Sequence, residues 1–217
     1  MDEVLKILLL LNYAGADIRS WKKIRELGFE PYKLLSSDSK YLEECGLTER
    51  AVLKIREGSL SGWAEKEYEK VLSVKADVIT CDDEKYPESL FDLKDAPLVL
   101  YIKGSASLLS HRTVGVVGTR KSTSYGREIS KRIGTNCSAS HISLISGGAS
   151  GIDGAAHLGT CDAGGRTAAV FGTGIDVLYP ASNAALFEKI TERGALITEF
   201  PTGSGAEPWH FPRRNRL

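Results

Sequence analysis

The spacing of hydrophobic residues in the first sixty positions predicts a set of short amphipathic helices. Residues 2–13 and 18–27 repeat apolar side chains every three or four positions, with Asp17 placed to cap the second helix and Gly28 to end it. Further short helices are expected at Tyr32–Leu35, Tyr41–Cys45 and Glu49–Arg56, the last one capped by Thr48. This pattern predicts a small all-α domain over residues 1–62.

The pattern changes after an amphipathic helix near residues 60–75, and we expect residues 63–76 to form a linker helix. Short apolar runs then predict strands, and helical spacing returns between them. The expected strands are 78–81, 98–102, 113–117, 142–145, 167–171 and 195–198, with helices at 125–139, 152–163 and 183–192. Apolar strands that alternate with helices predict an α/β domain over residues 77–217, with a Rossmann-like, doubly wound and mostly parallel sheet.

Glycine-rich loops follow three of these strands, at residues 118–122, 146–153 and 172–176. Loops at the carboxyl ends of parallel strands emerge at one edge of the sheet, where ligands bind. Glycine lets the backbone approach a phosphate closely, and the start of the following helix offers free N–H groups. We therefore expect an anion site with these candidate residues: Gly118, Arg120, Lys121, Gly147, Gly148 and Gly151.

Several common kinds of site are not indicated. The first loop lacks the GxGxxG fingerprint, and Ser146 stands where a dinucleotide site has an acidic residue. No GxxxxGK[ST] or GxSxG string is present. Asp153 and His157 are four positions apart, but a capping aspartate and a packed histidine are the preferred interpretation over an acid–base pair. We expect no cofactor and no metal.

The charges decide what kind of anion is expected. The chain has 217 residues, with 28 basic and 28 acidic residues, so binding to nucleic acid by bulk charge is excluded. Residues 112–217 nevertheless hold 12 Lys and Arg against 8 Asp and Glu. The tail at 209–216 interleaves aromatic rings with guanidinium groups, the combination that binds single-stranded nucleic acid. Its candidate residues are Phe211, Arg213, Arg214 and Arg216.

The remaining composition points to the cytoplasm. Four cysteines are far apart in the sequence and are expected to be reduced thiols. No apolar run is long enough to span a bilayer, and the first residues do not read as a secretory signal.

Several motifs occur in an order typical of one family. They are VVGTR at 116–120, SGGASGIDGAAH at 146–157, FGTGIDVLYP at 171–180 and FPRRNR at 211–216. Over residues 77–217 the chain resembles the DNA-processing protein A (Smf) family, and its N-terminal helices are similar to a SAM-like or helix-hairpin-helix module. The resemblance implies a homodimer that binds single-stranded DNA and loads a RecA-type recombinase during natural transformation, and it implies a binding and loading factor rather than an enzyme. It places Arg120 and the three tail arginines on DNA, with glycine N–H groups on phosphate.

The chain departs from the family pattern in three ways. Family members often have a basic residue where this chain has Ser150, and many have a lysine where it has Ala181 and Ser182. The family domain also continues past the FPRRNR motif, so we expect a fragment, a natural truncation or a degenerate copy with an open sheet edge. Two alternatives stay open: an enzyme similar to nucleotide phosphoribohydrolases, and a protein-binding scaffold whose DNA binding has decayed.

Overall fold

The computed structural model describes residues 1–28, 34, 36–56 and 62–217. The chain divides into two compact units, one made of Met1–Ser73 with Val78–Leu100 and the other of Val74–Asp77 with Tyr101–Leu217. The domain boundaries expected at residues 62 and 76 remain predictions. In the structure, residues 78–100 group with the N-terminal helices.

The helices of the first unit agree with the hydrophobic pattern. They are α1 (Glu3–Ala14), α2 (Ile18–Glu26), α4 (Ser39–Glu44), α5 (Glu49–Arg56) and α6 (Trp63–Ser73). The Asp17 carboxylate accepts hydrogen bonds from the backbone N–H groups of Arg19 and Ser20, and Thr48 Oγ1 accepts one from Ala51 N, so both expected N-caps are confirmed. The helix expected at Tyr32–Leu35 lies, apart from Leu34, outside the described residues, as do residues 60 and 61 of the helix expected near residues 60–75.

Helix α1 is the centre of the first unit. Its run Ile7–Leu11 is at most 1% exposed at every position, so this turn and a half is covered on all sides. Tyr13, at the end of α1, stacks on Trp63 of α6 with a ring-centroid distance of 4.4 Å. The unit therefore has its own hydrophobic core.

In the part of the chain that the structure describes, six strands form one sheet in the order β1-β2-β6-β5-β4-β3. Their bounds are β1 (Asp77–Thr80), β2 (Val99–Gly104), β3 (Thr113–Gly115), β4 (Ser143–Ser146), β5 (Thr167–Val170) and β6 (Ala195–Thr198). Strands β3, β4, β5 and β6 pair in parallel, and β2 pairs with β6 antiparallel. The expected α/β class, with a mostly parallel Rossmann-like sheet, is confirmed.

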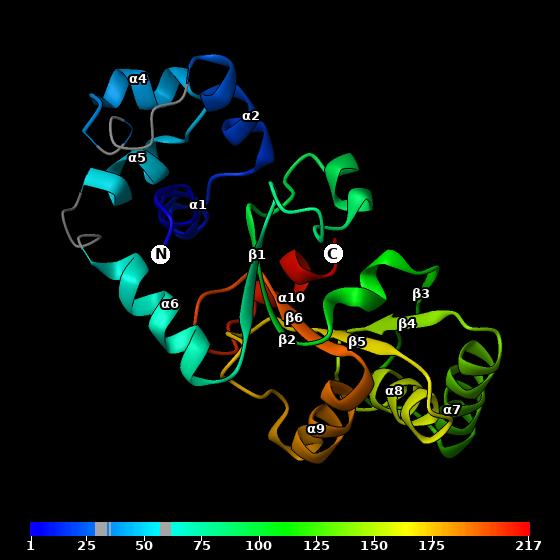
Figure 1. Ribbon diagram of the computed structural model, residues 1–217. Helices are drawn as coiled ribbons and strands as arrows, with labels where there is room; N and C mark the ends of the chain where they lie inside the picture. The colour runs from blue at the N-terminus through cyan, green and yellow to red at the C-terminus, as the bar shows by residue number, and fades with distance from the viewer. Residues whose placement is uncertain (29–33, 35, 57–61) are drawn as a thin grey trace. The chain divides into compact units, whose positions relative to one another are not determined.

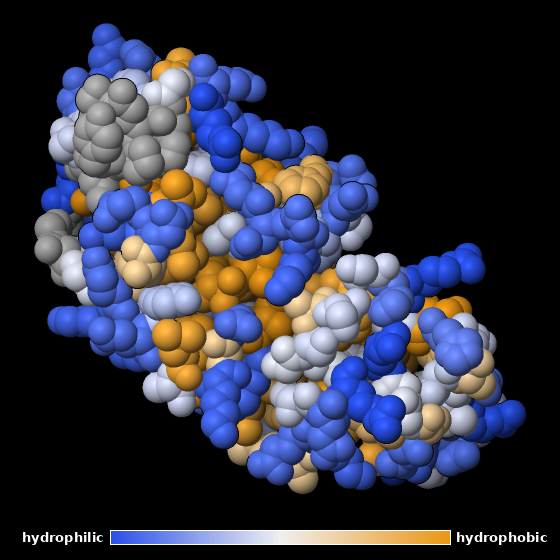
Figure 2. All heavy atoms as spheres, viewed as in Figure 1, coloured by the Kyte–Doolittle hydropathy of each residue, from blue (hydrophilic) through white to orange (hydrophobic). Residues whose placement is uncertain are grey.

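Helices connect the parallel strands in sequence: α7 (Ser124–Ala139), α8 (Ile152–Asp162) and α9 (Ala184–Arg193). Each crossover moves one strand further in the same direction, from β3 to β6. Because such crossovers are right-handed, the three helices lie on the same side of the strands, as Figure 1 shows. Hydrophilic residues cover most of the surface over these helices on the face seen in Figure 2.

The described residues also include the short 3₁₀ helices η1 (Glu88–Asp92), η2 (Ala106–Ser110) and η3 (Ala181–Asn183), and the helix α10 (His210–Arg214). Strand β3 is shorter than the expected 113–117 and lies at one edge of the sheet. Its three residues are exposed, and Val117 just beyond it is 80% exposed. The chain turns there into the first glycine-rich loop.

Candidate nucleic-acid interface

The glycine-rich loops meet at the carboxyl ends of the parallel strands, as expected. A cavity of about 570 Å³ lies there, lined by residues of the β3–α7 loop, the β4–α8 loop and the C-terminal residues 211–217. The third loop contributes Gly172, which is so close to Phe211 that an added Cβ would be 2.9 Å from the ring. Segments as much as 100 residues apart in sequence therefore form one site.

Arg120 and two aromatic rings lie together where this cavity adjoins a neighbouring pocket, and we call this cluster the cavity entrance. The exposed Arg120 guanidinium lies 5.1 Å from the centre of the Phe211 ring, a cation–π distance. The Tyr179 ring also packs against Phe211, with a distance of 5.5 Å between the ring centroids, and Tyr179 is 42% exposed. A neighbouring pocket is lined by these three residues together with Ser150. The arrangement offers an exposed cation and aromatic faces in the same place.

Lys121 follows Arg120 in the same loop and is also exposed. Its backbone N–H donates to Thr119 Oγ1 at 3.2 Å, which folds the loop back before α7 begins. Thr123 caps α7 by accepting from Gly126 N at 3.0 Å. The loop is thereby held at both ends while its two cations face solvent.

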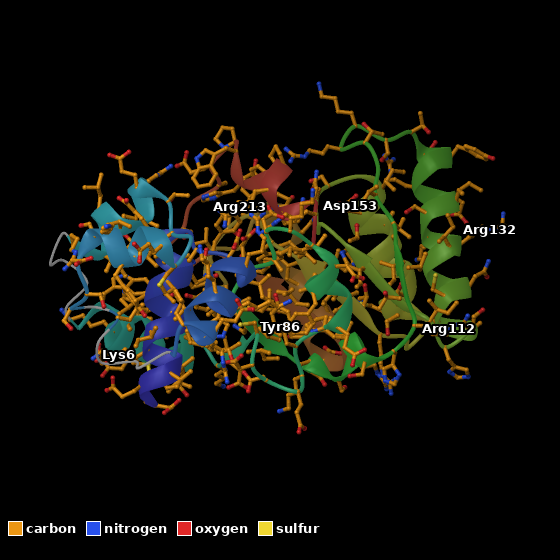
Figure 3. The ribbon with its side chains drawn as sticks, turned by 90° about the horizontal axis from the view of Figure 1, so that it is seen from above. Lys6, Tyr86, Arg112, Arg132, Asp153 and Arg213 are labelled. Atoms are coloured by element: carbon orange, nitrogen blue, oxygen red, sulfur yellow. The ribbon has the colours of Figure 1, made fainter. Side chains whose placement is uncertain are left out.

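Asp153 lies beneath the loops and is only 5% exposed. Its carboxylate accepts hydrogen bonds from two backbone N–H groups, Gly118 through Oδ1 and Gly147 through Oδ2, both at 3.2 Å. Figure 3 shows Asp153 on the same upper side of the ribbon as Arg213, whereas Arg132 points outward from α7. Asp153 therefore joins the loops that follow β3 and β4.

Arg214 lines the cavity and is nevertheless buried, with 8% exposure. Its Nη1 donates to the carbonyl oxygens of Gly147, at 2.7 Å, and Val170, and its Nε donates to Asn215 Oδ1. Burial lowers the pKa of the guanidinium, while the Asp153 carboxylate acts in the opposite direction. The side chain thus joins α10 to the ends of β4 and β5.

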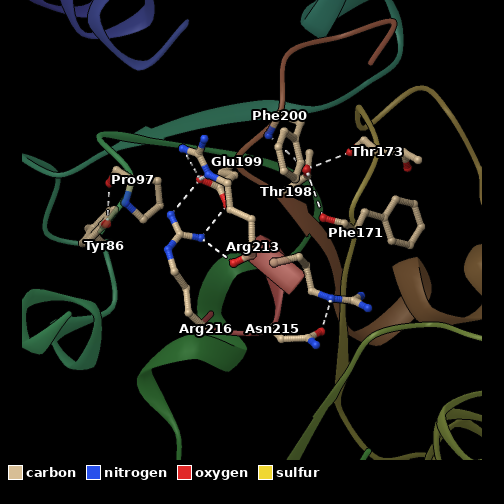
Figure 4. Close-up of polar contacts among 11 residues, drawn as sticks. Tyr86, Pro97, Phe171, Thr173, Thr198, Glu199, Phe200, Arg213, Asn215 and Arg216 are labelled. Atoms are coloured by element: carbon tan, nitrogen blue, oxygen red, sulfur yellow. Dashed lines mark hydrogen bonds and ion pairs between the residues drawn. The ribbon is translucent and has the colours of Figure 1, made fainter. Parts of the chain in front are cut away.

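Arg213 and Arg216 share one buried partner, the Glu199 carboxylate. Arg213 Nη2 lies 3.0 Å from Oε2, and Arg216 Nη1 lies 2.5 Å from Oε1. Figure 4 shows Glu199 held between the two guanidinium groups. Arg213 keeps 39% of its side chain exposed and Arg216 keeps 16%. Glu199, Tyr179 and Asn215 were not among the predicted site residues; a carboxylate directly after the apolar strand 195–198 was the available signal for Glu199.

The glycines of the site allow close packing. An added Cβ at Gly118 would lie 2.6 Å from Ile152, one at Gly147 would lie 2.5 Å from the Arg214 guanidinium, and one at Gly148 would lie 2.9 Å from Phe187. Gly151 has φ +86°, and its Cβ would collide with Thr119 O. The Gly147 N–H group already donates to Asp153. Contact of these glycines with phosphate stays a prediction.

His157 is completely buried, as the packed interpretation expected. Its Nδ1 lies 2.7 Å from Thr167 Oγ1, and burial, aided by the charge of Arg214, lowers its pKa to about 3. Asp153 bonds to loop amides instead. Over the described residues, no group of three or more His, Cys, Asp or Glu could hold a metal, and no helix there is long and apolar enough to cross a membrane.

The fold and the site define a Rossmann-like protein with an exposed cation and aromatic rings around a cavity at the carboxyl ends of its parallel strands. The family model of DNA recombination-mediator protein A matches residues 77–217. Among curated relatives, Protein Smf of Synechocystis sp. is 32% identical over 221 residues, which cover 91% of this chain. The DNA processing protein DprA of Bacillus subtilis is 34% identical over 172 residues, or 76% of this chain. The chain belongs to the DNA recombination-mediator protein A family.

Solved structures agree with this assignment. DNA processing protein A of Streptococcus pneumoniae superposes with a TM-score of 0.79 and 28% identity, over 98% of this chain and 73% of that one. The protein from Helicobacter pylori, whose structure describes a single-stranded DNA binding mode, gives a TM-score of 0.59 and 27% identity, over 65% of this chain and 64% of that one. The chain spans 54% and 58% of the lengths of the Synechocystis and Bacillus relatives.

Proposed function

We infer that this chain binds single-stranded DNA at the cavity entrance and acts as a mediator of recombination. One observation carries the proposal: an exposed, solvent-facing Arg120 lies over the Phe211 ring where the glycine-rich loops meet. A guanidinium binds a phosphate, and an aromatic face stacks an unpaired base, so both parts of a nucleotide have a partner there. The single-stranded DNA binding described for the Helicobacter relative supports the same conclusion.

The predicted contact residues differ in how free they are to meet DNA. Arg120 and Lys121 are exposed, and Phe211 and Arg213 are partly so, which makes these four the proposed direct contacts. Arg216 is mostly covered while it binds Glu199. The positive charge of Arg213 and Arg216 exceeds that of the single Glu199 carboxylate, so the pair still contributes an attractive field for a polyanion.

Delivery of the strand to a RecA-type recombinase, and a homodimeric state, are part of the same proposal. Both rest on the family membership. A recombinase ATPase assay on single-stranded DNA, with and without this chain, tests delivery: stimulation supports it, and no effect at saturating protein contradicts it. Light scattering coupled to gel filtration tests the dimer, which requires twice the monomer mass of 23.6 kDa.

We propose a binding protein rather than an enzyme, because Asp153 and His157 are engaged in internal hydrogen bonds. The phosphoribohydrolase alternative predicts that nucleoside monophosphates release free base when incubated with the protein. The scaffold alternative predicts no DNA binding at all. The proposed mediator differs from both alternatives in these assays, because it binds DNA and releases no base.

The central experiment replaces Arg120 with alanine and measures binding of a labelled oligonucleotide by fluorescence anisotropy at low salt. Loss of a charge-assisted phosphate contact is expected to weaken binding by about 1–3 kcal/mol, or about 5- to 150-fold. Arg132→Ala is the matched control, since Arg132 is an exposed arginine that points outward from α7. Equal losses in the two variants, or no loss at Arg120, would remove Arg120 from the site.

A further inference from the structure

Gly147 is held from both sides by side chains of opposite charge. Its N–H donates to the Asp153 carboxylate at 3.2 Å, and its carbonyl oxygen accepts from Arg214 Nη1 at 2.7 Å. Both side chains are more than nine-tenths buried. Buried charges are tolerated only where hydrogen bonds and an opposite charge compensate the loss of water, and this peptide group supplies part of that compensation to each of them.

Each of the two side chains has a second backbone partner on another segment. Asp153 also accepts from Gly118 N, two residues before Arg120 in the β3–α7 loop. Arg214 also donates to Val170 O at the end of β5, and it lies in α10 three residues after Phe211. A continuous path of hydrogen bonds therefore runs from the Arg120 loop, through Asp153, Gly147 and Arg214, to the helix that carries Phe211.

This path connects the two groups that meet at the cavity entrance, the Arg120 guanidinium and the Phe211 ring. The direct interaction between these two groups is weak, since an exposed cation–π contact contributes only about 0.5–1 kcal/mol. Their positions must be set by the backbone that carries them. The Arg214 guanidinium also packs directly against Gly147, because a Cβ added at Gly147 would lie 2.5 Å from it.

We propose that Asp153 and Arg214 are positioning residues of the single-stranded DNA site. They hold the Arg120 loop and the Phe211 helix in register through Gly147, and they make no phosphate contact of their own. The inference rests on the proposed function and deepens it: Arg214 acts from a buried position in the wall of the cavity, whereas the exposed Arg120 meets the strand.

Salt dependence separates a positioning arginine from a phosphate-binding one. Each phosphate contact to a single strand adds about 0.7 to the slope of log affinity against log salt, because counterions are released. Arg120→Ala is expected to lower both the affinity and the slope. Arg214→Gln is expected to lower the affinity about 10- to 100-fold, as when a supporting residue behind a ligand is lost, with the slope unchanged. A slope reduced as in Arg120→Ala would overturn the proposal.

For the Asp153→Asn variant, the two explanations predict opposite changes in the affinity for single-stranded DNA. Removal of a negative charge near a polyanion strengthens binding if only the electric field matters. The positioning role predicts weaker binding instead, since Gly118 and Gly147 each donate to a different carboxylate oxygen, and the NH₂ group that replaces one of these oxygens in asparagine is a donor that cannot accept. Tighter or unchanged binding by the folded variant, at any salt concentration, contradicts the proposal. Circular dichroism at the assay temperature establishes that each variant is folded.

A measurement on the unsubstituted chain covers the case in which a variant does not fold. The Gly118 and Gly147 amides are expected to exchange slowly with deuterium, and to stay slow when oligothymidine is added, because Asp153 rather than phosphate accepts from them. Fast exchange in the free protein overturns the positioning role. Absence of oligothymidine binding by the unsubstituted chain contradicts the proposed function itself, so the two failures are distinguishable.

Discussion

At the scale of single residues, the arginines of the site differ because of their partners. Arg120 lies over an aromatic ring and faces solvent, whereas Arg214 is buried against backbone carbonyl oxygens. Arg213 and Arg216 both form ion pairs with Glu199. The sequence predicted DNA contact for all four. Their different surroundings come from residues 14 to 91 positions away in the sequence, and the pattern of a single motif does not show contacts over such distances.

His157 predicts how stability depends on pH. Its pKa is lowered to about 3 in the folded chain, against about 6.5 when unfolded, so the unfolded state binds a proton more readily between these values. The free energy of unfolding should therefore fall as pH drops below about 6.5, by up to about 1.4 kcal/mol per pH unit from this residue.

Urea unfolding between pH 7.5 and 4.5 measures this dependence. His157→Gln is expected to flatten the curve, because glutamine does not titrate. His141→Asn is the control, since His141 is exposed and its φ of 54° suits asparagine. If the two variants keep the same slope as the original chain, the buried histidine is not its source.

At the scale of elements, the sequence predicted most boundaries within two residues. Strand β6 has the expected bounds, and the caps of α2 and α5 are made by Asp17 and Thr48. Local signals suffice there because a cap or an apolar run is defined by neighbouring residues. Strand β3 ends earlier than expected, since Gly118 packs against Ile152 of α8 and the chain must turn before it.

Substitution of Gly151, the residue just before α8, is expected to destabilise the protein. Its φ of +86° is costly for alanine by about 1–2 kcal/mol, and the new Cβ would also lie 2.8 Å from Arg120 O. Gly151→Ala is therefore expected to lower the free energy of unfolding by at least about 2 kcal/mol and to disturb the Arg120 loop. Gly205→Ala, with no atom within 4 Å of the new Cβ, is the control in chemical denaturation. Equal stabilities of the two variants would contradict this explanation.

At the scale of the whole molecule, the formal net charge is zero. The net charge of the chain therefore supplies no attraction for a strand of DNA, and the attraction comes from the local cations near the cavity, so that each of them has a measurable share in binding. Ser150 lines a pocket together with Arg120 and Phe211.

Ser150→Lys is accordingly expected to strengthen binding of single-stranded DNA and to steepen its salt dependence by about 0.7 in slope. The reason is one added phosphate contact with its released counterion. Anisotropy titrations at two or more salt concentrations measure both quantities. Lysine at exposed Ser140, after the end of α7, is the matched control and should change neither by as much. An unchanged slope in Ser150→Lys would show that the position does not reach the strand.

The sequence by itself determined the α/β class, the helical N-terminal region, the positions of most elements and the edge of the sheet at which a ligand site forms. These follow from hydrophobic periodicity and from turn and cap residues, which act over a few neighbouring positions. Only the tertiary structure decided that Asp153 binds the amides of Gly118 and Gly147, and that Glu199 takes two of the tail arginines. Burial and charge pairing depend on which distant segments meet in space, and these meetings are determined by the order in which the strands pair in the sheet.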